Sequence, residues 1–328
     1  MTGIVTVTLS AAIDQTYVLA DLVMGAVNRS RSAHREVSGK GVNVARAIDL
    51  AGHPVSAVLA LGEQDLPLLA QIESGQVFYT VAVPGHARVN TTIIDDHGQT
   101  TKVNERSIPL TREQWHALRD LAMTEVERLD ADWLVLCGTV PTLVETGELV
   151  PFGELVEAAS VGGLRVAVDT SGEALDLLVA SYLGDLALIK PNTHELADAV
   201  RRDLESIGDV IAAAQELRAR GVDTVYVSMG EDGALAVAQG GVWWARATAP
   251  ALVNAAGAGD ASLAGFLVHA LEHDVPAALS AAASWGALAV SQSTTLLSAP
   301  ETAPAAELVA SPDPERKLRD PARASDRR

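Results

Sequence analysis

Cysteine, basic residues and long apolar runs are scarce in this sequence. Its 328 residues include one cysteine, Cys137, and carry 24 Lys and Arg against 42 Asp and Glu, for a formal net charge of −18. One cysteine excludes an internal disulfide and a thiolate zinc cage, and it fits a reducing, cytoplasmic compartment. Because nucleic-acid phosphates are neutralised by Lys and Arg, the acidic balance argues against a nucleic-acid partner.

The sequence contains no signal for a membrane segment. No stretch of 18 uncharged apolar residues occurs, and residues 1–17 lack the basic and long apolar regions of a secretory signal. The hydrophobic fraction of 48% and the charged fraction of 20% are typical of a soluble globular chain that buries its own core. A small anionic ligand fits this composition, because it needs only a few local cations.

Short β-branched runs alternate with amphipathic helical stretches along most of the chain. Most of the runs are apolar on both faces, as expected for parallel strands with helices on each side. Glycine turns at 232–233 and 240–241 predict that the sheet ends in antiparallel strands. The pattern predicts an α/β fold with a mostly parallel sheet, whose strands lie at residues 4–9, 55–61, 133–137, 165–169, 186–189 and 224–228.

Two segments interrupt this alternation. Residues 14–35 and 77–104 show strand-like patterns with a turn at 95–98, and no helix follows either segment directly. We therefore predict that they form a small separate β-layer inserted into the α/β domain.

The composition changes at residue 298. Five of the chain's 14 prolines and no aromatic residue lie in the last 31 residues. Such a segment has little apolar surface to bury. We predict a folded domain over residues 1–297 and a disordered tail over residues 298–328.

The segment 254–260, NAAGAGD, leads into an apolar helical run. Small residues leave the first backbone N–H groups of a helix unobstructed, and these groups attract an anion together with the helix dipole. Asp260 would stand in the first turn beside that anion. An acid there is also simply a good helix start, so this motif alone leaves both interpretations open.

A second glycine-rich segment, SGKGVN at 38–43, also precedes a helix. It is neither a Walker loop nor GxGxxG, since the required spacing and the Ser or Thr after the lysine are missing. A glycine approach, the Lys40 cation and the Asn43 amide one turn later suit a polyol or a sugar phosphate. The alternative is a solvated helix N-terminus.

A third segment, KPNTHE at 190–195, follows an apolar strand. Asn192 and Glu195 have the spacing of a helix N-cap with a reciprocal glutamate. Their oxygens also suit a hydrated Mg²⁺ with its phosphates, and the spacing alone does not separate the two interpretations.

The fourth segment, SMGEDGA at 228–234, closes a strand with glycines. Glycines there would let a nucleotide approach the backbone, although a plain hairpin turn explains them equally well.

Together and in this order, these segments resemble the ribokinase-like family of sugar kinases, the pfkB group, over residues 3–297. The resemblance is closest to the branch of 1-phosphofructokinase and tagatose-6-phosphate kinase, which acts on ketohexoses that already carry a phosphate. Residues 8–14, 88–90 and 137–141 also match that branch, and the DTSGEAL segment at 169–175 is present unchanged. The departures from its pattern are Ser10, Ala11, Ser38 and Ala255.

The resemblance implies a doubly wound sheet flanked by helices, with a β-sheet lid made from the two inserted segments and shared in a homodimer. It implies ATP and Mg²⁺, with Asp260 as the general base beside an anion hole of Gly257, Ala258 and Gly259. The implied sugar-phosphate ligands are Asp14, Gly39, Lys40, Asn43, Arg88 and Asn90, with Lys40 and Arg88 on the existing phosphate. The implied ATP ligands are Lys190, Asn192, Ser228, Gly230 and Gly233, and Asn192 and Glu195 order Mg²⁺ through water.

The implied reaction is ATP-dependent phosphorylation of a ketohexose phosphate, and the resemblance favours fructose 1-phosphate giving fructose 1,6-bisphosphate. Tagatose 6-phosphate and fructose 6-phosphate are alternative substrates. Lys40, Arg88 and the unchanged residues 169–175 argue against a kinase for an unphosphorylated sugar or a nucleoside. A sugar-phosphate-binding regulator on a kinase scaffold is a rival of another class, which measurable turnover would exclude.

Overall fold

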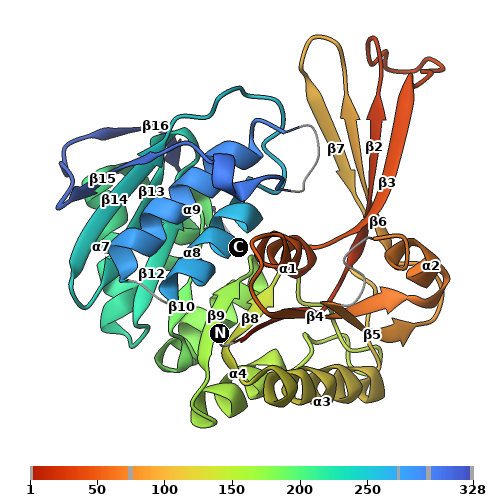
Figure 1. Cartoon of the computed structure of the whole chain (residues 1–328), viewed down its shortest axis with the longest axis horizontal. Helices are drawn as coiled ribbons and strands as arrows, with labels where there is room; N and C mark the ends of the chain where they lie inside the picture. The colour runs from red at the N-terminus through yellow and green to blue at the C-terminus, as the bar shows by residue number, and fades with distance from the viewer. Residues whose placement is uncertain (1–2, 73–76, 272–273, 293–296, 326–328) are drawn as a thin grey trace.

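A large sheet forms the centre of the molecule (Figure 1). The computed structural model describes residues 3–72, 77–271, 274–292 and 297–325, and within them this sheet has ten strands. Their order is β15-β14-β13-β12-β10-β9-β8-β1-β4-β5, parallel from β12 to β5 and antiparallel from β12 to β15. The bounds are β1 (Gly3–Thr8), β4 (Val55–Gly62), β5 (Phe78–Val83), β8 (Ala131–Cys137), β9 (Arg165–Asp169), β10 (Leu188–Ile189), β12 (Thr224–Ser228), β13 (Ala234–Ala238), β14 (Gly241–Ala247) and β15 (Ala306–Ala310).

Helices cover both faces of this sheet. Strand β1 is buried on both faces, because Ile4 belongs to one core cluster whereas Val5 and Val7 belong to the other. The Ile4 side is covered by α1 (Lys40–Leu50), α8 (Ala258–Ala270) and α9 (Val275–Ala289). The Val5 side is covered by α3 (Arg112–Leu129), α4 (Phe152–Val161), α5 (Glu173–Ser181), α6 (Thr193–Val200) and α7 (Ile207–Ala219). The predicted α/β fold, a doubly wound and mostly parallel sheet, is confirmed.

A second sheet projects from the α/β body beside α1 (Figure 1). It has the order β3-β2-β6-β7 and consists of β2 (Ala12–Val18), β3 (Ser32–Ser38), β6 (Arg88–Ile94) and β7 (Thr100–Asn104). We call these four strands the small sheet. The prediction of an inserted β-layer is confirmed for them.

The prediction is wrong for the beginning of the second inserted segment. Residues Phe78–Val83 form β5, which pairs in parallel with β4 at the edge of the large sheet. Val83 is buried in the main core, and Tyr79 and Val81 pack against that core. Their alternation reflects a half-covered edge strand, which has the same period as a strand of a separate layer.

The predicted disordered tail is also corrected. Residues Ala306–Ala310 form β15 on the edge of β14, and β16 (Lys317–Ala322) pairs antiparallel with β11 (Leu204–Ser206). Leu318 and Ala322 are buried. The tail is poor in apolar residues, but the edge of β14 supplies backbone partners and two side chains reach the core.

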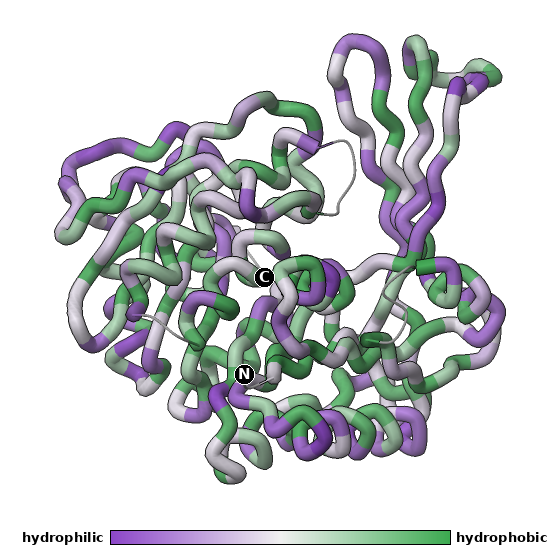
Figure 2. The backbone as a smooth tube through the Cα atoms, viewed as in Figure 1, coloured by the Kyte–Doolittle hydropathy of each residue, from purple (hydrophilic) through white to green (hydrophobic). Residues whose placement is uncertain are grey.

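Hydropathy along the chain follows this architecture. Figure 2 shows hydrophobic positions concentrated in the large sheet and mixed hydrophilic and hydrophobic positions along the small sheet. Among the described residues, no helix combines the length and the apolar character needed to cross a bilayer. Short elements complete the fold: α2 (Leu66–Leu69), η1 (Glu63–Asp65), η3 (Leu183–Asp185), η4 (Gly230–Asp232) and η5 (Pro300–Thr302).

Candidate active site

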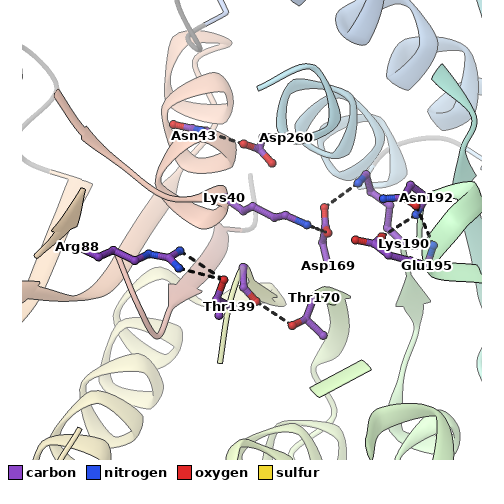
Figure 3. Close-up of polar contacts among 11 residues, drawn as sticks. Lys40, Asn43, Arg88, Thr139, Asp169, Thr170, Lys190, Asn192, Glu195 and Asp260 are labelled. Carbon is purple, nitrogen blue, oxygen red and sulfur yellow. Dashed lines mark hydrogen bonds and ion pairs between the residues drawn. The ribbon is translucent and has the colours of Figure 1, made fainter. Parts of the chain in front are cut away.

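Polar side chains gather where the parallel strands β8, β9, β10 and β12 end. Two helices, α1 and α8, begin at the same edge of the sheet, and Figure 3 shows the residues that they carry facing one another. Open α/β sheets bind ligands at the carboxyl ends of their strands. The topology therefore places the predicted site residues where such a fold forms a site.

Asp169, the last residue of β9, is the electrostatic centre of this region. Its Oδ1 lies 2.5 Å from Nζ of Lys40 and its Oδ2 lies 2.7 Å from Nζ of Lys190. Burial opposes all three charges, but their mutual attraction outweighs it, so the pKa of Asp169 is lowered and the pKa values of both lysines are raised. The three groups are ionised together and leave one net positive charge.

Asp260 lies in the first turn of α8, close to Lys40, Asp169 and Lys190, which we call the charged triad. Its Oδ2 accepts a hydrogen bond of 2.8 Å from Nδ2 of Asn43, on the facing helix α1. The pKa of Asp260 is raised to about 6, mainly by burial and then by the negative charge of Asp169. The hydrogen bond from Asn43 and the charges of Lys40 and Lys190 lower it to a smaller extent. Asp260 is therefore a carboxylate at neutral pH that takes up a proton more readily than an exposed one.

Glycines shape the start of α8. Gly257 is the N-cap residue, with φ of 79°, in the left-handed region where a side chain is strained. A Cβ on Gly259 would lie 3.5 Å from Nζ of Lys190. Lys190 therefore lies beside the first turn of α8, and a cation next to a helix N-terminus is an arrangement that favours an anion.

A separate polar group lies at the base of the small sheet. Asp14 and Asn90 are partners in the β2–β6 register, and Nδ2 of Asn90 donates to Oδ1 of Asp14 at 3.1 Å. The guanidinium of Arg88 donates to Oγ1 of Thr139 at 3.4 Å. Burial lowers the pKa of Arg88, and the charge of Asp14 raises it to a smaller extent. Nε of Arg88 is buried and has no hydrogen-bond partner among the described residues.

The Gly138-Thr139 turn lies between the polar group at the base of the small sheet and the charged triad. A Cβ on Gly138, whose φ is 90°, would lie 3.8 Å from Cβ of Lys40. Figure 3 shows Arg88 reaching toward Thr139 and Lys40 reaching toward Asp169. Gly39, with φ of 146°, is held against Thr8, because a Cβ there would lie 2.9 Å from Cγ2 of that side chain.

The third predicted motif folds as the helix cap that its spacing suggested. Oδ1 of Asn192 accepts from the Glu195 backbone N–H at 2.9 Å, and Oε2 of Glu195 accepts from the Asn192 N–H at 2.8 Å. The pKa of Glu195 is raised by burial and lowered to a smaller extent by Lys40. The capping box uses one oxygen of each side chain, so it is compatible with the predicted contact of these residues with a hydrated Mg²⁺.

The fourth motif lies beside this cap. Ser228 forms a backbone bridge with Asn192, and its N–H donates to the Pro191 carbonyl at 3.1 Å. Gly230 and Gly233 have φ of 54° and 91° around the turn η4, a backbone shape that other residues rarely adopt. The predicted site residues thus fall into three groups. The first group, around the start of α8, consists of Lys40, Asn43, Lys190, Gly259 and Asp260. The second group consists of Asn192, Glu195, Ser228, Gly230 and Gly233, and the third, at the base of the small sheet, consists of Asp14, Arg88 and Asn90.

Asp169 is the residue to which the sequence assigned no role. Its signal was present, since an acid ends a buried strand and begins the DTSGEAL segment. Its contacts with Lys40 and Lys190 come from distant parts of the chain, which motif spacing does not reveal.

Comparisons with known proteins identify the family of the chain. A sequence profile of the pfkB family carbohydrate kinases matches residues 3–302. The chain belongs to this family. A 1-phosphofructokinase of Rhodobacter capsulatus is 36% identical over 292 residues, which cover 87% of this chain and 90% of that protein. A 1-phosphofructokinase of Xanthomonas campestris is 33% identical, covering 82% of this chain and 84% of that protein.

A solved structure supports the same relationship. Phosphofructokinase-2 from Escherichia coli, in complex with substrates and products, has a TM-score of 0.80 and 27% identity to this pfkB kinase, over 90% of this chain and 95% of that chain. The family profile ends at residue 302, so β15 and β16 lie beyond the matched residues.

Proposed function

We propose that this pfkB kinase transfers the γ-phosphoryl group of ATP to a hydroxyl of a ketohexose phosphate, and that fructose 1-phosphate is the substrate and fructose 1,6-bisphosphate the product. The observation that carries the proposal is Asp260, a buried carboxylate with a pKa raised to about 6, at the N-terminus of a helix that faces two lysines. The names of the two bacterial relatives support the choice of fructose 1-phosphate.

The chain's own residues account for the transfer step. Asp260 accepts the proton of the sugar hydroxyl while that oxygen bonds to the γ-phosphorus, the bond from phosphorus to the bridging oxygen breaks, and ADP leaves. The N–H groups around Gly257, Ala258 and Gly259 bind the transferred group. Because the transition state is loose, positioning and neutralisation of charge dominate, and a weak base suffices.

We assign the substrate's existing phosphate to Lys40 and Arg88, which approach the Gly138-Thr139 turn from different elements. Asp14, Asn43 and Asn90 supply oxygens and amides for sugar hydroxyls, and Gly39 leaves its backbone accessible. Lys40 is paired with Asp169 in the structure, so an incoming phosphate shares or replaces that pair.

ATP is assigned to Lys190, Asn192, Ser228, Gly230 and Gly233. Among the described residues, no three His, Cys, Asp or Glu side chains gather as metal ligands. Oxygen donors at Asn192 and Glu195 nevertheless suit Mg²⁺, which keeps most of its waters and binds phosphates. When bound, Mg²⁺ supplies neutralisation of phosphate charge, and Asn192 and Glu195 would hold it through water.

The pH profile should follow the ionisation of Asp260. A base must be deprotonated to act, so kcat/KM should fall by about tenfold per pH unit below the pKa, which lies at about 6, and level off above it. The hydrogen bond from Asn43 lowers that pKa, so Asn43→Ala should move the acid limb to higher pH. Rates measured from pH 5 to pH 9 check both expectations, and a limb that does not move in the variant contradicts them.

Substrate choice is tested by ADP release with Mg-ATP over a panel of fructose 1-phosphate, fructose 6-phosphate, tagatose 6-phosphate, fructose, ribose and adenosine. We expect turnover with fructose 1-phosphate and little with the unphosphorylated compounds. A preference for tagatose 6-phosphate or fructose 6-phosphate would keep the reaction class and change the substrate. A preference for ribose or adenosine would refute the assignment of Lys40 and Arg88, and the absence of turnover would favour the non-catalytic regulator.

We further propose that the small sheet covers the sugar and pairs with a second copy of the chain in the cytoplasm. Apolar side chains are exposed where β2 connects to β3 and on β7, at Val23, Met24, Val27 and Val103. Sedimentation equilibrium should give a dimer, and a monomer at micromolar concentration would refute this pairing.

A further inference from the structure

Strand β16 and the residue before it contact the turn that we assign to ATP. The Arg319 backbone N–H donates to Oδ2 of Asp232 at 2.6 Å, and its guanidinium lies 3.1 Å from Oε2 of Glu231. Nη2 of Arg316 lies 3.6 Å from Oδ1 of Asp232. Both acids belong to η4, between Gly230 and Gly233, so residues at the end of the chain hold this turn directly.

Asp232 is a buried carboxylate, with a side chain only 3% exposed. Its Oδ1 has no hydrogen-bond partner among the described residues, so the two arginines provide its charge compensation. Trp244 fixes the same turn from the sheet, because its Nε1 donates to the Asp232 carbonyl at 2.7 Å and its ring lies 4.5 Å below the Arg316 guanidinium. Turn, sheet and C-terminal segment form one connected unit.

Charge gives this contact a consequence for the nucleotide. Two acids on the turn would repel a triphosphate that lies against Gly230 and Gly233. Arg316 and Arg319 bring two positive charges to those acids from outside the family-matched residues 3–302.

The C-terminal segment is anchored independently of these arginines. Strand β15 pairs with β14, Leu318 and Ala322 are buried, and Arg323 pairs with Asp203 and Glu205 beside β11. The arginines that face η4 are partly exposed, 34% for Arg316 and 56% for Arg319, so they are not part of the core that folds this segment.

We propose that Arg316 and Arg319 are positioning residues for ATP: they hold the turn η4 in place and neutralise Glu231 and Asp232 beside the bound nucleotide. The proposal rests on the nucleotide site assigned above. It gives residues 316–319, at the start of β16, a role in affinity for ATP and none in affinity for the sugar phosphate, which is assigned to the other end of the site.

The test is the double variant Arg316→Ala/Arg319→Ala in the full-length protein. We expect the KM for ATP to rise by about three- to tenfold, since partly exposed ion pairs contribute modestly, while the KM for the sugar phosphate changes by less than twofold. ATP binding measured by calorimetry, without turnover, should weaken by the same factor. The matched control is Arg323→Ala, which removes an arginine from the same segment without touching η4 and should leave the KM for ATP unchanged.

A rescue separates positioning from general damage. Adding Asp232→Asn to the double variant removes the uncompensated buried charge and keeps an oxygen that can accept the N–H of residue 319, so at least half of the lost ATP affinity should return. Failure of this rescue, an equal rise in both KM values, or an equal effect of Arg323→Ala would overturn the proposal. If the wild type turns over no phosphoketose and binds no ATP, the proposed function fails as well, whereas an active wild type with an unaffected double variant refutes this inference alone.

Discussion

Replacing Asp260 by Asn should lower kcat by roughly 10² to 10⁴ while both substrates still bind. The amide keeps the shape of the side chain and its place in the first turn of α8, but it cannot accept the proton of the sugar hydroxyl. If Asp260 served only as a helix-starting acid, the change would leave kcat nearly intact, because asparagine also suits the start of a helix. Steady-state rates at pH 8 separate these outcomes by orders of magnitude.

Folding of the Asp260→Asn protein provides the control. The folded-state pKa of Asp260 is raised, so the folded protein binds more protons than the unfolded chain between the ordinary Asp value and about pH 6. The contribution of this group to stability therefore falls as pH rises through that window, and a neutral amide should not lower the free energy of unfolding at pH 8. Asp274→Asn, an N-cap acid on α9 whose Oδ1 accepts the Ala277 N–H, is the matched variant and should keep wild-type kcat. A folded Asp260→Asn protein with near-normal kcat would end the assignment of the base.

Removing either proposed phosphate cation should mainly raise the KM for the sugar phosphate. Lys40→Ala and Arg88→Ala each delete a charge-assisted bond present in the ground state and in the transition state, worth roughly 1.5 to 3 kcal/mol, or about ten- to a hundredfold in KM. The KM for ATP should barely change. Kinetics at pH 8 are preferred, because Lys40 also lowers the pKa of Asp260.

Two features make these variants interpretable. Alanine at the first position of α1 preserves the helix, and Asp169 keeps its pair with Lys190 when Lys40 is removed. Arg31→Ala is a matched control for Arg88, since Arg31 pairs with Asp96 at an exposed part of the small sheet and should leave both KM values unchanged. Loss of ATP binding with retained sugar-phosphate binding would place Lys40 and Arg88 on the wrong ligand.

Local patterns account for the parts of the fold that the sequence predicted. Helix α6 begins with the predicted capping box at Asn192 and Glu195, because three-residue spacing alone positions these groups. The turn at 240–241 likewise joins β13 to β14 as an antiparallel pair. In each case the interacting residues are neighbours in the chain.

Contacts between distant segments account for the rest. The pairing of Lys40 with Asp169 joins residues 129 positions apart, and no local period marks it. Strand β5 alternates as a strand of the small sheet would, and only its partner β4 assigns it to the large sheet. The C-terminal segment is ordered by contacts with Asp232 and with the edge of β14, and its amino-acid composition does not reveal such distant contacts.

Strand β15 also bears on self-association. Without it, β14 would present a row of unpaired N–H and C=O groups beside Trp243 and Trp244, a template for pairing with other chains and hence for aggregation. The edge that replaces it is a short strand that carries Glu307 and is flanked by Pro304 and Pro312, which cannot donate to a further ladder. Strand β15 thus protects this edge of the large sheet from pairing with the strands of other molecules.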